Sequence, residues 1–160
     1  TTLLQVIREI AVAAGACGMV GGQVLDISTD SKPVDAASLK FLHQAKTGAL
    51  FRAAVRAGAI LAQATERELT LLTQYADHFG LAFQITDDIL DVIGNPELIG
   101  KPVGSDAKNH KQTYVTLYTL EGAKQMAQHA VDNALDALSS FGSEADTLRQ
   151  LVSMLTLRTS

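Results

Sequence analysis

Apolar residues recur every three or four positions along most of this chain, which is the spacing of one face of an α-helix. The first such segment spans residues 3–27, and four glycines within it each lower helix propensity by up to roughly 1 kcal/mol relative to alanine. Clustered glycines in an apolar helix indicate that another backbone comes very close. The pattern therefore predicts a helix at 3–27 that packs tightly against a neighbour.

A second helix is predicted after a loop at residues 28–33. Asp35 can cap its first turn, and the helix continues to about Ala64. Its apolar positions recur at helical spacing and are Leu39, Leu42, Leu50, Ala53 and Ala57.

A third helix is predicted to begin at Thr65, where Glu66 and Glu68 complete the signature of a helix start. It continues to Val92 or Ile93. The residues that follow mark a long loop and are Gly94, Asn95, Pro96, Gly100, Pro102 and Gly104.

Two or three shorter helices complete the chain. One ends near Gly142, and the last begins at Ser143 with Asp146 at the spacing of a capping box. No segment shows the convincing alternation of a strand. We therefore expect an all-α fold, a helical bundle in which residues 1–160 belong to one domain.

Composition narrows the classes of function. Hydrophobic residues make up 47% of the chain and charged residues 19%, which argues against disorder. The net charge is −4 and no run is dense in Lys or Arg, so nucleic acid is not an expected partner. The single Cys17 excludes an internal disulfide and a cysteine-based zinc site, and it fits a reducing cytoplasm.

The longest nearly uncharged stretch runs from Ile10 to Leu25 and contains Gln23. A membrane span needs about 20 predominantly apolar residues. We therefore expect a buried helix here and no stable membrane insertion.

The strongest chemical signal is a polar stripe on the third helix. At roughly 100° per residue, Gln84, Asp87, Asp88 and Asp91 fall within an arc of about 100°, and the rest of the circumference is apolar. A surface helix would show a broad polar face instead. The stripe indicates carboxylates on a helix that is otherwise buried.

Three carboxylates so close together repel one another, and burying each uncompensated charge costs several kcal/mol. A cation should therefore lie opposite Asp87, Asp88 and Asp91. Mg²⁺ fits best, because it takes one or two carboxylates and keeps water and substrate phosphates as its other ligands. The alternative is a solvated acidic face in which Asp91 caps or pairs locally.

Lysines are the second candidate feature. Lys46 lies in line with Leu42 and Leu50, so it either extends outward to solvent or reaches into a cavity that holds an anion. The glycine-punctuated loop supplies Lys101 and Lys111, which suit a lid over phosphates because the amine is a compact point charge. An ordinary exposed loop is the alternative.

Together these features resemble the trans-isoprenyl diphosphate synthases of the polyprenyl synthetase family, such as bacterial farnesyl or geranylgeranyl diphosphate synthases. The resemblance covers nearly the whole chain, in five stretches that stand in the family's order. They are G-M-V-G-G-Q-V-L-D at 18–26, H-Q-A-K-T-G-A-L-F at 43–51, G-L-A-F-Q-I-T-D-D-I-L-D at 80–91, G-K-P-V-G-S-D at 100–106 and K-Q-T-Y at 111–114.

The resemblance implies the isoprenoid (class I terpenoid) synthase fold and a metal site. Asp87, Asp88 and Asp91 match the family's second aspartate-rich motif, which helps bind the Mg²⁺ ions that bridge to the allylic diphosphate. The implied activity is that of a short-chain trans-prenyltransferase. It condenses isopentenyl diphosphate with dimethylallyl or geranyl diphosphate, giving farnesyl or geranylgeranyl diphosphate.

The resemblance also implies roles for basic and polar residues. Lys46 and Lys101 match lysines that hold the allylic diphosphate, with help from Lys111. Thr47 and Gln84 match residues that line the site of ionisation and proton loss, and we class them with Lys46 as catalytic.

Three further residues follow from the same resemblance. Phe83 lies close to the reacting chains, and Gln23 and Asp26 belong to a helix that faces the same cavity. A cytoplasmic homodimer is the assembly that the family implies.

One departure from the family pattern is large. The family's first aspartate-rich motif and its upstream basic residues, which hold isopentenyl diphosphate, are missing, and the chain opens on Thr1 rather than Met. We therefore expect residues 1–160 to be the C-terminal portion of a prenyl synthase domain that is inactive by itself.

Three alternatives remain open at this point. The first is a non-catalytic or regulatory subunit that pairs with a complete synthase. The second is a structural helical bundle, which does not explain why five segments match at once. The third is a class I terpene cyclase, whose second metal motif mixes Asn or Asp with Ser/Thr and Glu, a pattern that this sequence lacks.

Overall fold

The structure is a computed structural model, and it describes the whole chain except residues 30–31, 95–102, 110 and 158–160. The elements in chain order are α1 (Thr2–Ala14), α2 (Met19–Ser28), α3 (Ala36–His43), the π-helical segment η1 (Gln44–Gly48), α4 (Ala49–Leu61), α5 (Glu66–Ile93), α7 (Ser105–Lys108), α8 (Tyr114–Ala137), the 3₁₀ turn η2 (Ser143–Ala145) and α9 (Asp146–Leu157). The described residues therefore form helices and loops, and the all-α prediction is confirmed.

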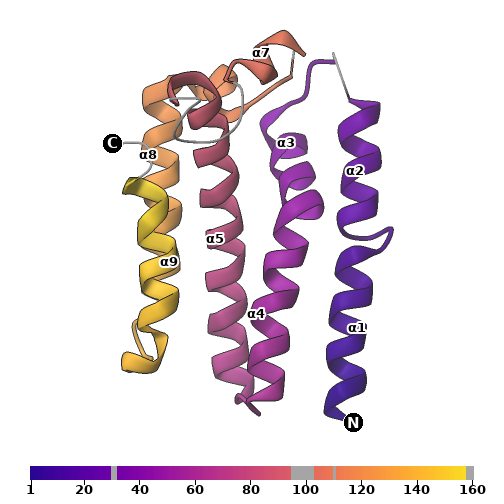
Figure 1. Cartoon of the computed structure of the whole chain (residues 1–160), viewed down its shortest axis with the longest axis vertical. Coiled ribbons are helices and arrows are strands. Elements are labelled where there is room, and N and C mark those ends of the chain that lie inside the picture. Colours follow the sequence, from indigo (N-terminus) through magenta and orange to yellow (C-terminus); the bar gives the residue numbers. More distant parts are fainter. Residues whose placement is uncertain (30–31, 95–102, 110, 158–160) are drawn as a thin grey trace.

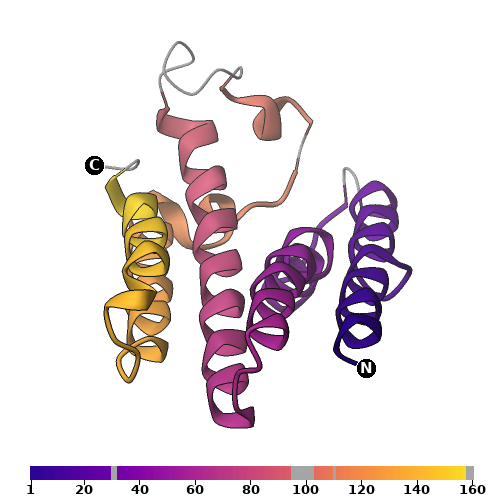
Figure 2. The same ribbon diagram turned by 60° about the horizontal axis from the view of Figure 1, so that its bottom comes forward.

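The long helices run along a common axis (Figure 1). Across the molecule, α8 and α9 form one side, α5 lies next, α3 and α4 follow, and α1 and α2 form the opposite side. Figure 2 shows the same order after rotation, with α7 over one end of the bundle. Segments from both halves of the sequence therefore meet at the end of α5 that carries the acidic stripe.

The start and end of α5 confirm the third predicted helix. The Thr65 side chain accepts a hydrogen bond from the Glu68 amide, and the Glu68 carboxylate accepts one from the Thr65 amide at 2.7 Å. This reciprocal capping box fixes the first turn. The helix then continues without interruption to Ile93.

The second predicted helix is interrupted. It contains one π-helical turn, Gln44–Gly48, and it ends at Leu61 rather than near Ala64. Gln63 adopts a φ of 58°, which lies in the left-handed region and stops the helix early. Periodicity did not reveal the π turn, because the apolar positions before it and those after it each keep helical spacing.

The main core lies between α5, α8 and α9. Tyr75 of α5 is 2% exposed, and its hydroxyl donates a hydrogen bond to the Leu148 carbonyl oxygen of α9 at 2.9 Å. Closer to the acidic stripe, Ile85 and Ile89 are fully buried in a cluster with Tyr114 of α8. Core side chains therefore pack against α5 both near Tyr75 and near the acidic stripe, so the helix holds its polar side chains in a fixed position.

The C-terminal helices match the prediction in kind but not in their bounds. α8 ends at Ala137 rather than near Gly142, whereas the next helical turn begins at Ser143 as predicted. The Arg149 guanidinium donates hydrogen bonds to the carbonyl oxygens of Leu138 and Gly142, both at 2.8 Å. These bonds satisfy carbonyls that follow α8, so the chain can leave the helix early.

The prediction for residues 3–27 is wrong in two respects. The segment forms two helices that are separated by a turn at Gly15 to Gly18, and it is largely exposed. A Cβ atom at Gly18 would lie 2.9 Å from the Ala13 Cα atom, so the bend between the helices requires a glycine there. Only one side of α1 and α2 contacts α4 and η1, and no described residue covers the other side.

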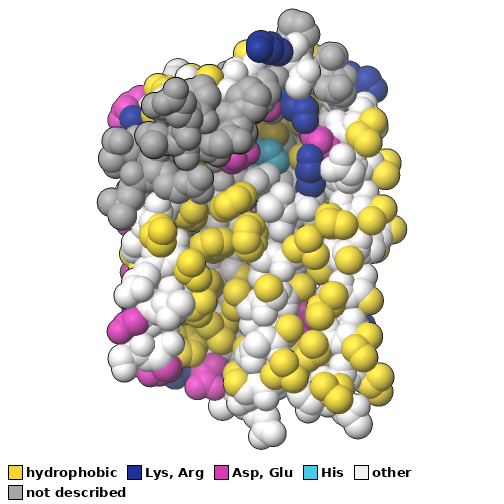
Figure 3. Space-filling model, viewed as in Figure 1, with side chains coloured by type: hydrophobic (Ala, Val, Ile, Leu, Met, Phe, Trp, Pro, Cys, Tyr) yellow, Lys and Arg dark blue, Asp and Glu magenta, His cyan; other side chains and the backbone are white. Residues whose placement is uncertain are grey.

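The span Thr2–Ser28 is also the one stretch, among the described residues, that is long and apolar enough to cross a membrane, and its most apolar 18-residue window has a mean hydropathy of 1.6. Only 11% of its most apolar window is buried, so the expectation of a buried helix at 10–25 is not met within this chain. The apolar side chains that remain uncovered contribute to the extensive hydrophobic surface in Figure 3.

Candidate functional site

Two glycines hold η1 between α2 and α5. A Cβ atom at Gly22 of α2 would lie 2.6 Å from the Lys46 Cα atom, and one at Gly80 of α5 would lie 3.2 Å from the Gly48 Cα atom. Real Cβ atoms do not approach backbone as closely as at Gly22, so the contact with Lys46 depends on glycine there. At Gly80 a Cβ atom would be tight, and η1 would have to shift by a few tenths of an ångström. The predicted close approach of backbone to the first glycine-rich segment is thus confirmed at Gly22.

The π turn sends two of its polar side chains toward different helices. Lys46 Nζ lies 2.6 Å from Asp26 Oδ2 of α2, and Thr47 Oγ1 donates to Gln84 Oε1 of α5 at 3.4 Å. π turns occur frequently at functional sites because they re-aim side chains within a helix. Here the turn places an ammonium group and a hydroxyl beside the end of the acidic stripe.

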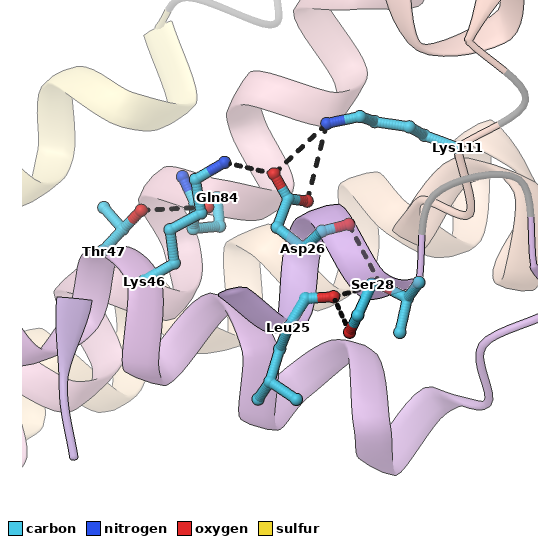
Figure 4. Close-up of polar contacts among 8 residues, drawn as sticks. Leu25, Asp26, Ser28, Lys46, Thr47, Gln84 and Lys111 are labelled. Atoms are coloured by element: carbon cyan, nitrogen blue, oxygen red, sulfur yellow. Dashed lines mark hydrogen bonds and ion pairs between the residues drawn. The ribbon is translucent and has the colours of Figure 1, made fainter. Parts of the chain in front are cut away.

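A second lysine joins the first from a distant part of the sequence. Lys111, which precedes α8, has its Nζ atom 3.5 and 3.4 Å from the two carboxylate oxygens of Asp26 (Figure 4). Burial raises the pKa of the Asp26 carboxyl, but the hydrogen bond from Lys46 and the charges of both lysines outweigh it and lower that pKa. Asp26 is therefore ionised and paired with two cations.

The three aspartates of the stripe do not behave alike. Asp87 is half-buried and lines the cavity described below. Asp88 is 7% exposed and accepts a hydrogen bond from the Tyr114 amide at 2.7 Å. Asp91 is 3% exposed and accepts one from the Asp106 amide at 3.1 Å. Two of the three carboxylates thus also anchor the segments that follow α5.

Burial is the main reason that the pKa of Asp88 rises to about 7. The hydrogen bond from Tyr114 lowers it, while the negative charges of Asp106, Asp87 and Asp91 raise it further. This carboxyl therefore lies in a field with excess negative charge. A divalent cation nearby would restore its ionisation, which is the behaviour expected of a cation-binding position.

These groups surround one cavity of about 140 Å³ between α2, η1, α5 and the segment before α8. Charges of both signs line it, and the charged residues are Asp26, Lys46, Asp87, Asp88, Asp106 and Lys111. Figure 3 shows dark blue, magenta and cyan side chains together at the upper end of a face that is otherwise largely apolar. The structure therefore brings Gln84, Asp87 and Asp88 of the predicted stripe and two of the predicted lysines into one site. Asp91 and Thr47 are not among the described residues that line it.

His43 lines the same cavity, and the sequence reasoning missed it. Its ring lies 5.6 Å from the Tyr114 ring, and burial lowers its pKa to about 4. The Nδ1 atom of His43 and the hydroxyl of Tyr114 are buried polar atoms without a hydrogen-bond partner among the described residues. The only signal in the sequence was that His43 precedes Lys46 by three positions on a predicted helix.

Other predicted site residues lie outside the cavity or outside the described part of the chain. Gln23 is exposed on α2, and Phe83 packs against Phe51 at a ring distance of 5.2 Å. Neither is among the described residues that line the cavity. Lys101 lies outside the described residues. Their assignment to substrate binding stays a prediction.

The residues present fit a magnesium ion that a substrate helps to bind. Within the described part of the chain, no three His, Cys, Asp or Glu side chains form a ready-made metal cage. Mg²⁺ does not need one, because it commonly uses one or two carboxylates together with water and substrate phosphates. Asp87 and Asp88 supply such carboxylates, and Lys46 and Lys111 can hold the phosphates.

Comparison with known proteins finds relatives of one kind. A farnesyl diphosphate synthase of Bacillus subtilis is 41% identical over 155 residues, covering 97% of this chain and 52% of that protein. A geranylgeranyl diphosphate synthase of Cyanophora paradoxa is 39% identical over 144 residues, covering 89% of this chain and 48% of the relative. The chain thus spans about half the length of the curated relatives it matches.

A solved structure has the same fold. The geranyltransferase of Helicobacter pylori, complexed with magnesium and isoprenyl diphosphate, superposes with a TM-score of 0.80 at 29% identity, covering 96% of this chain and 50% of that chain. The described helices therefore belong to the isoprenoid synthase fold, as the sequence predicted. The model of the family described as polyprenyl synthetase matches residues 2–155. This chain belongs to the polyprenyl synthetase family.

Proposed function

We propose that the protein containing residues 1–160 is a short-chain trans-prenyltransferase. It condenses isopentenyl diphosphate with dimethylallyl or geranyl diphosphate and forms farnesyl or geranylgeranyl diphosphate. The observation that carries the proposal is the cavity in which Asp87 and Asp88 meet Lys46 and Lys111. Membership of the family and the names of its relatives support the same reaction.

The lysines bind and orient the diphosphate of the allylic substrate. Lys46 and Lys111 approach from different segments, so their ammonium groups can contact oxygens on different sides of the anion. When the allylic carbon–oxygen bond breaks, the electron pair leaves with the diphosphate. Fixed cations beside those oxygens stabilise the developing charge more than they stabilise the substrate, which lowers the barrier.

Magnesium supplies further charge neutralisation at the phosphate oxygens when it is bound. Asp87 and Asp88 would hold it in the cavity, and Asp91 is proposed as a third ligand of the motif. Asp91 also accepts the Asp106 amide at 3.1 Å, so it has a second, structural task. Rigid packing of α5 keeps all three carboxylates in register with the lysines.

Bond formation takes place beside the polar cavity. The double bond of isopentenyl diphosphate attacks the allylic carbon, and the new cation then loses a proton to an oxygen of the released diphosphate. Thr47 and Gln84, joined at 3.4 Å, lie next to this position and are proposed to orient the reacting groups.

We further propose that these residues are the C-terminal portion of a prenyl synthase domain and that they are inactive alone. The chain spans about half of its relatives, and the groups proposed here account for one side of the reaction only. The whole protein is proposed to be a cytoplasmic homodimer. Family resemblance is what supports this assembly and location.

A prenyl-transfer assay tests the proposal. The whole protein is incubated with labelled isopentenyl diphosphate, geranyl diphosphate and Mg²⁺, and products are identified after dephosphorylation. We expect farnesol or geranylgeraniol from the whole protein and none from residues 1–160. Lys46→Met should reduce the rate by about 100-fold in the whole protein, because one fixed cation at the leaving group is lost. A whole protein that forms no prenyl product would contradict the proposal.

A further inference from the structure

Asp26 occupies the space between the two lysines. Its Oδ2 atom lies 2.6 Å from Lys46 Nζ, and its two oxygens lie 3.5 and 3.4 Å from Lys111 Nζ. Figure 4 shows the carboxylate pointing from α2 toward both ammonium groups. One carboxylate thus serves as the counter-ion of two cations that come from separate segments.

The carboxylate is held in this position by its own helix. Gly22 lies one turn earlier on α2, where the backbone of Lys46 packs against it. The backbone contact fixes the end of α2 relative to η1, and the Asp26 side chain is only 16% exposed. The pair with Lys46 is therefore built into the packing of two helices, unlike a surface ion pair between mobile side chains.

This carboxylate and a diphosphate offer the same interaction to a lysine. Both present anionic oxygens to an ammonium group, which has three donors and no acceptor. Two ammonium groups that approach the same site would repel each other without an anion between them. A diphosphate that enters the cavity meets donors that Asp26 already uses, and it also meets the negative charge of Asp26.

We propose that Asp26 is a positioning residue that holds Lys46 and Lys111 together in the ligand-free protein and competes with diphosphate for their ammonium groups. This inference rests on the proposed function, since it requires diphosphate to bind at these lysines. Asp26 thereby keeps the lysines in place before binding and limits how tightly they retain a released diphosphate.

The test measures the affinity and dissociation rate of inorganic diphosphate in the whole protein. Diphosphate is titrated calorimetrically in excess Mg²⁺, and its dissociation is followed by stopped flow. Asp26→Asn keeps the shape of the side chain and removes its charge. We expect the Kd to fall about fivefold to tenfold, mainly through slower dissociation, because the competing anion is gone. If Asp26 had a purely structural role, Asp26→Asn would damage the site and weaken the binding of diphosphate. Tighter binding therefore indicates that Asp26 competes with diphosphate.

Matched variants complete the experiment. Asp132→Asn removes an equal charge from the exposed face of α8, where Asp132 accepts a hydrogen bond from Gln128 at 2.8 Å, and it should change the Kd less than twofold. Asp26→Ser should tighten binding as Asp26→Asn does, whereas Asp26→Glu should not. In a Lys111→Met background, Asp26→Asn should increase the affinity for diphosphate by a smaller factor, because Asp26 and diphosphate then compete for Lys46 alone.

The outcomes separate this inference from the function on which it rests. If wild-type protein binds diphosphate and both charge-removing variants bind it equally or more weakly, competition by Asp26 is overturned while the proposed function stands. If neither wild type nor variants bind diphosphate, the proposed function fails together with this inference.

Discussion

The polar cavity and the outer face of α1 and α2 are both open to solvent. Only in the cavity do side chains find partners of matching chemistry among the described residues. In the cavity, Asp26 is paired with Lys46 at 2.6 Å, and the Asp88 carboxylate accepts the Tyr114 amide at 2.7 Å. On the outer face, Leu4 is 64% exposed and Ile27 is 68% exposed. Charged groups have partners from this chain, whereas large apolar groups are left without cover by the described residues.

The polar site is therefore built largely within residues 1–160, whereas the apolar face lacks a partner among the described residues. A contiguous apolar surface of this kind marks a place where another surface packs. Since the chain spans about half the length of its relatives, we propose that the remaining portion of the same domain covers α1 and α2. The polar cavity, by contrast, is assembled by residues 1–160 and can be tested through them.

The largest expected effect is the loss of a cavity carboxylate. Asp87→Asn should lower the rate of prenyl transfer by about 10³-fold in the whole protein, because it removes a ligand of the metal that neutralises the diphosphate. Steady-state assays at several Mg²⁺ concentrations measure it. Asp77→Asn, on an exposed part of α5 where Asp77 pairs with Arg52 at 3.0 Å, is the matched control. A loss below tenfold would remove Asp87 from the proposed metal site.

The next effect concerns the backbone contact between α2 and η1. Gly22→Val should lower the free energy of unfolding by about 3 kcal/mol, because its side chain would overlap the backbone of Lys46. Urea denaturation measures the change. Gly58→Ala is the control, since nothing lies within 4 Å of its added Cβ, and it should stabilise α4 by about 0.5–1 kcal/mol. If Gly22→Val is as stable as wild type, α2 does not dock as described.

Acid should remove the stabilising contribution of His43, whereas protonation of Asp88, whose pKa is raised to about 7, acts in the opposite direction. The folded-state pKa of His43, about 4, lies below the ordinary histidine value of 6.5, so between these pH values the unfolded chain binds a proton that the folded chain does not. The contribution of His43 to the free energy of unfolding is fully present above pH 6.5 and is lost as the pH falls toward 4. Between pH 7 and pH 5 this histidine should cost about 2 kcal/mol. The free energy of unfolding is measured at pH 7 and pH 5 for wild type and for His43→Leu, and the variant should lack the loss of about 2 kcal/mol that is due to His43. If wild type and variant show the same pH dependence, His43 does not contribute to it.

The smallest expected effect is on the outer face. Ile7, which is 60% exposed, can be changed to Gln in residues 1–160 at a cost within about 0.5 kcal/mol. In the whole protein the same substitution should cost about 2 kcal/mol or more, because the proposed cover buries it. Ile89→Ala, at a fully buried position, should cost about 2–5 kcal/mol in both. Equal small effects of Ile7→Gln in both proteins would contradict a covered outer face.

The elements that sequence predicted well are those specified by local signals. The bounds of α5 follow from Thr65 with Glu68 at its start and from apolar periodicity up to Ile93. The alignment of Asp87 with Asp88 and Gln84 along one stripe follows from helix geometry alone. Neither conclusion depends on what packs against the helix.

The features that sequence missed depend on distant partners. Asp88 and Asp91 are hydrogen-bonded to the amides of Tyr114 and Asp106, and no pattern within α5 specifies where those amides lie. The π turn around Lys46 depends likewise on neighbours, because α2 and α5 hold it from both sides. Long-range packing, rather than local propensity, decides these positions.

The exposure of α1 and α2 was mispredicted for a different reason. An apolar composition at 10–25 indicates that a segment is covered, and it does not say by which chain segment. Composition therefore predicted burial, although the described residues cover only the side that faces α4, where Arg56 pairs with Glu9 at 2.8 Å.

The most direct test of the central claim is a crystal structure of the protein with inorganic diphosphate and Mn²⁺, which replaces Mg²⁺ and can be located by its anomalous scattering. We expect a manganese peak within coordination distance of Asp87, with diphosphate oxygens contacting both that ion and Lys46. A peak elsewhere, or diphosphate bound away from the cavity, would contradict the assignment of these residues to metal-assisted diphosphate binding.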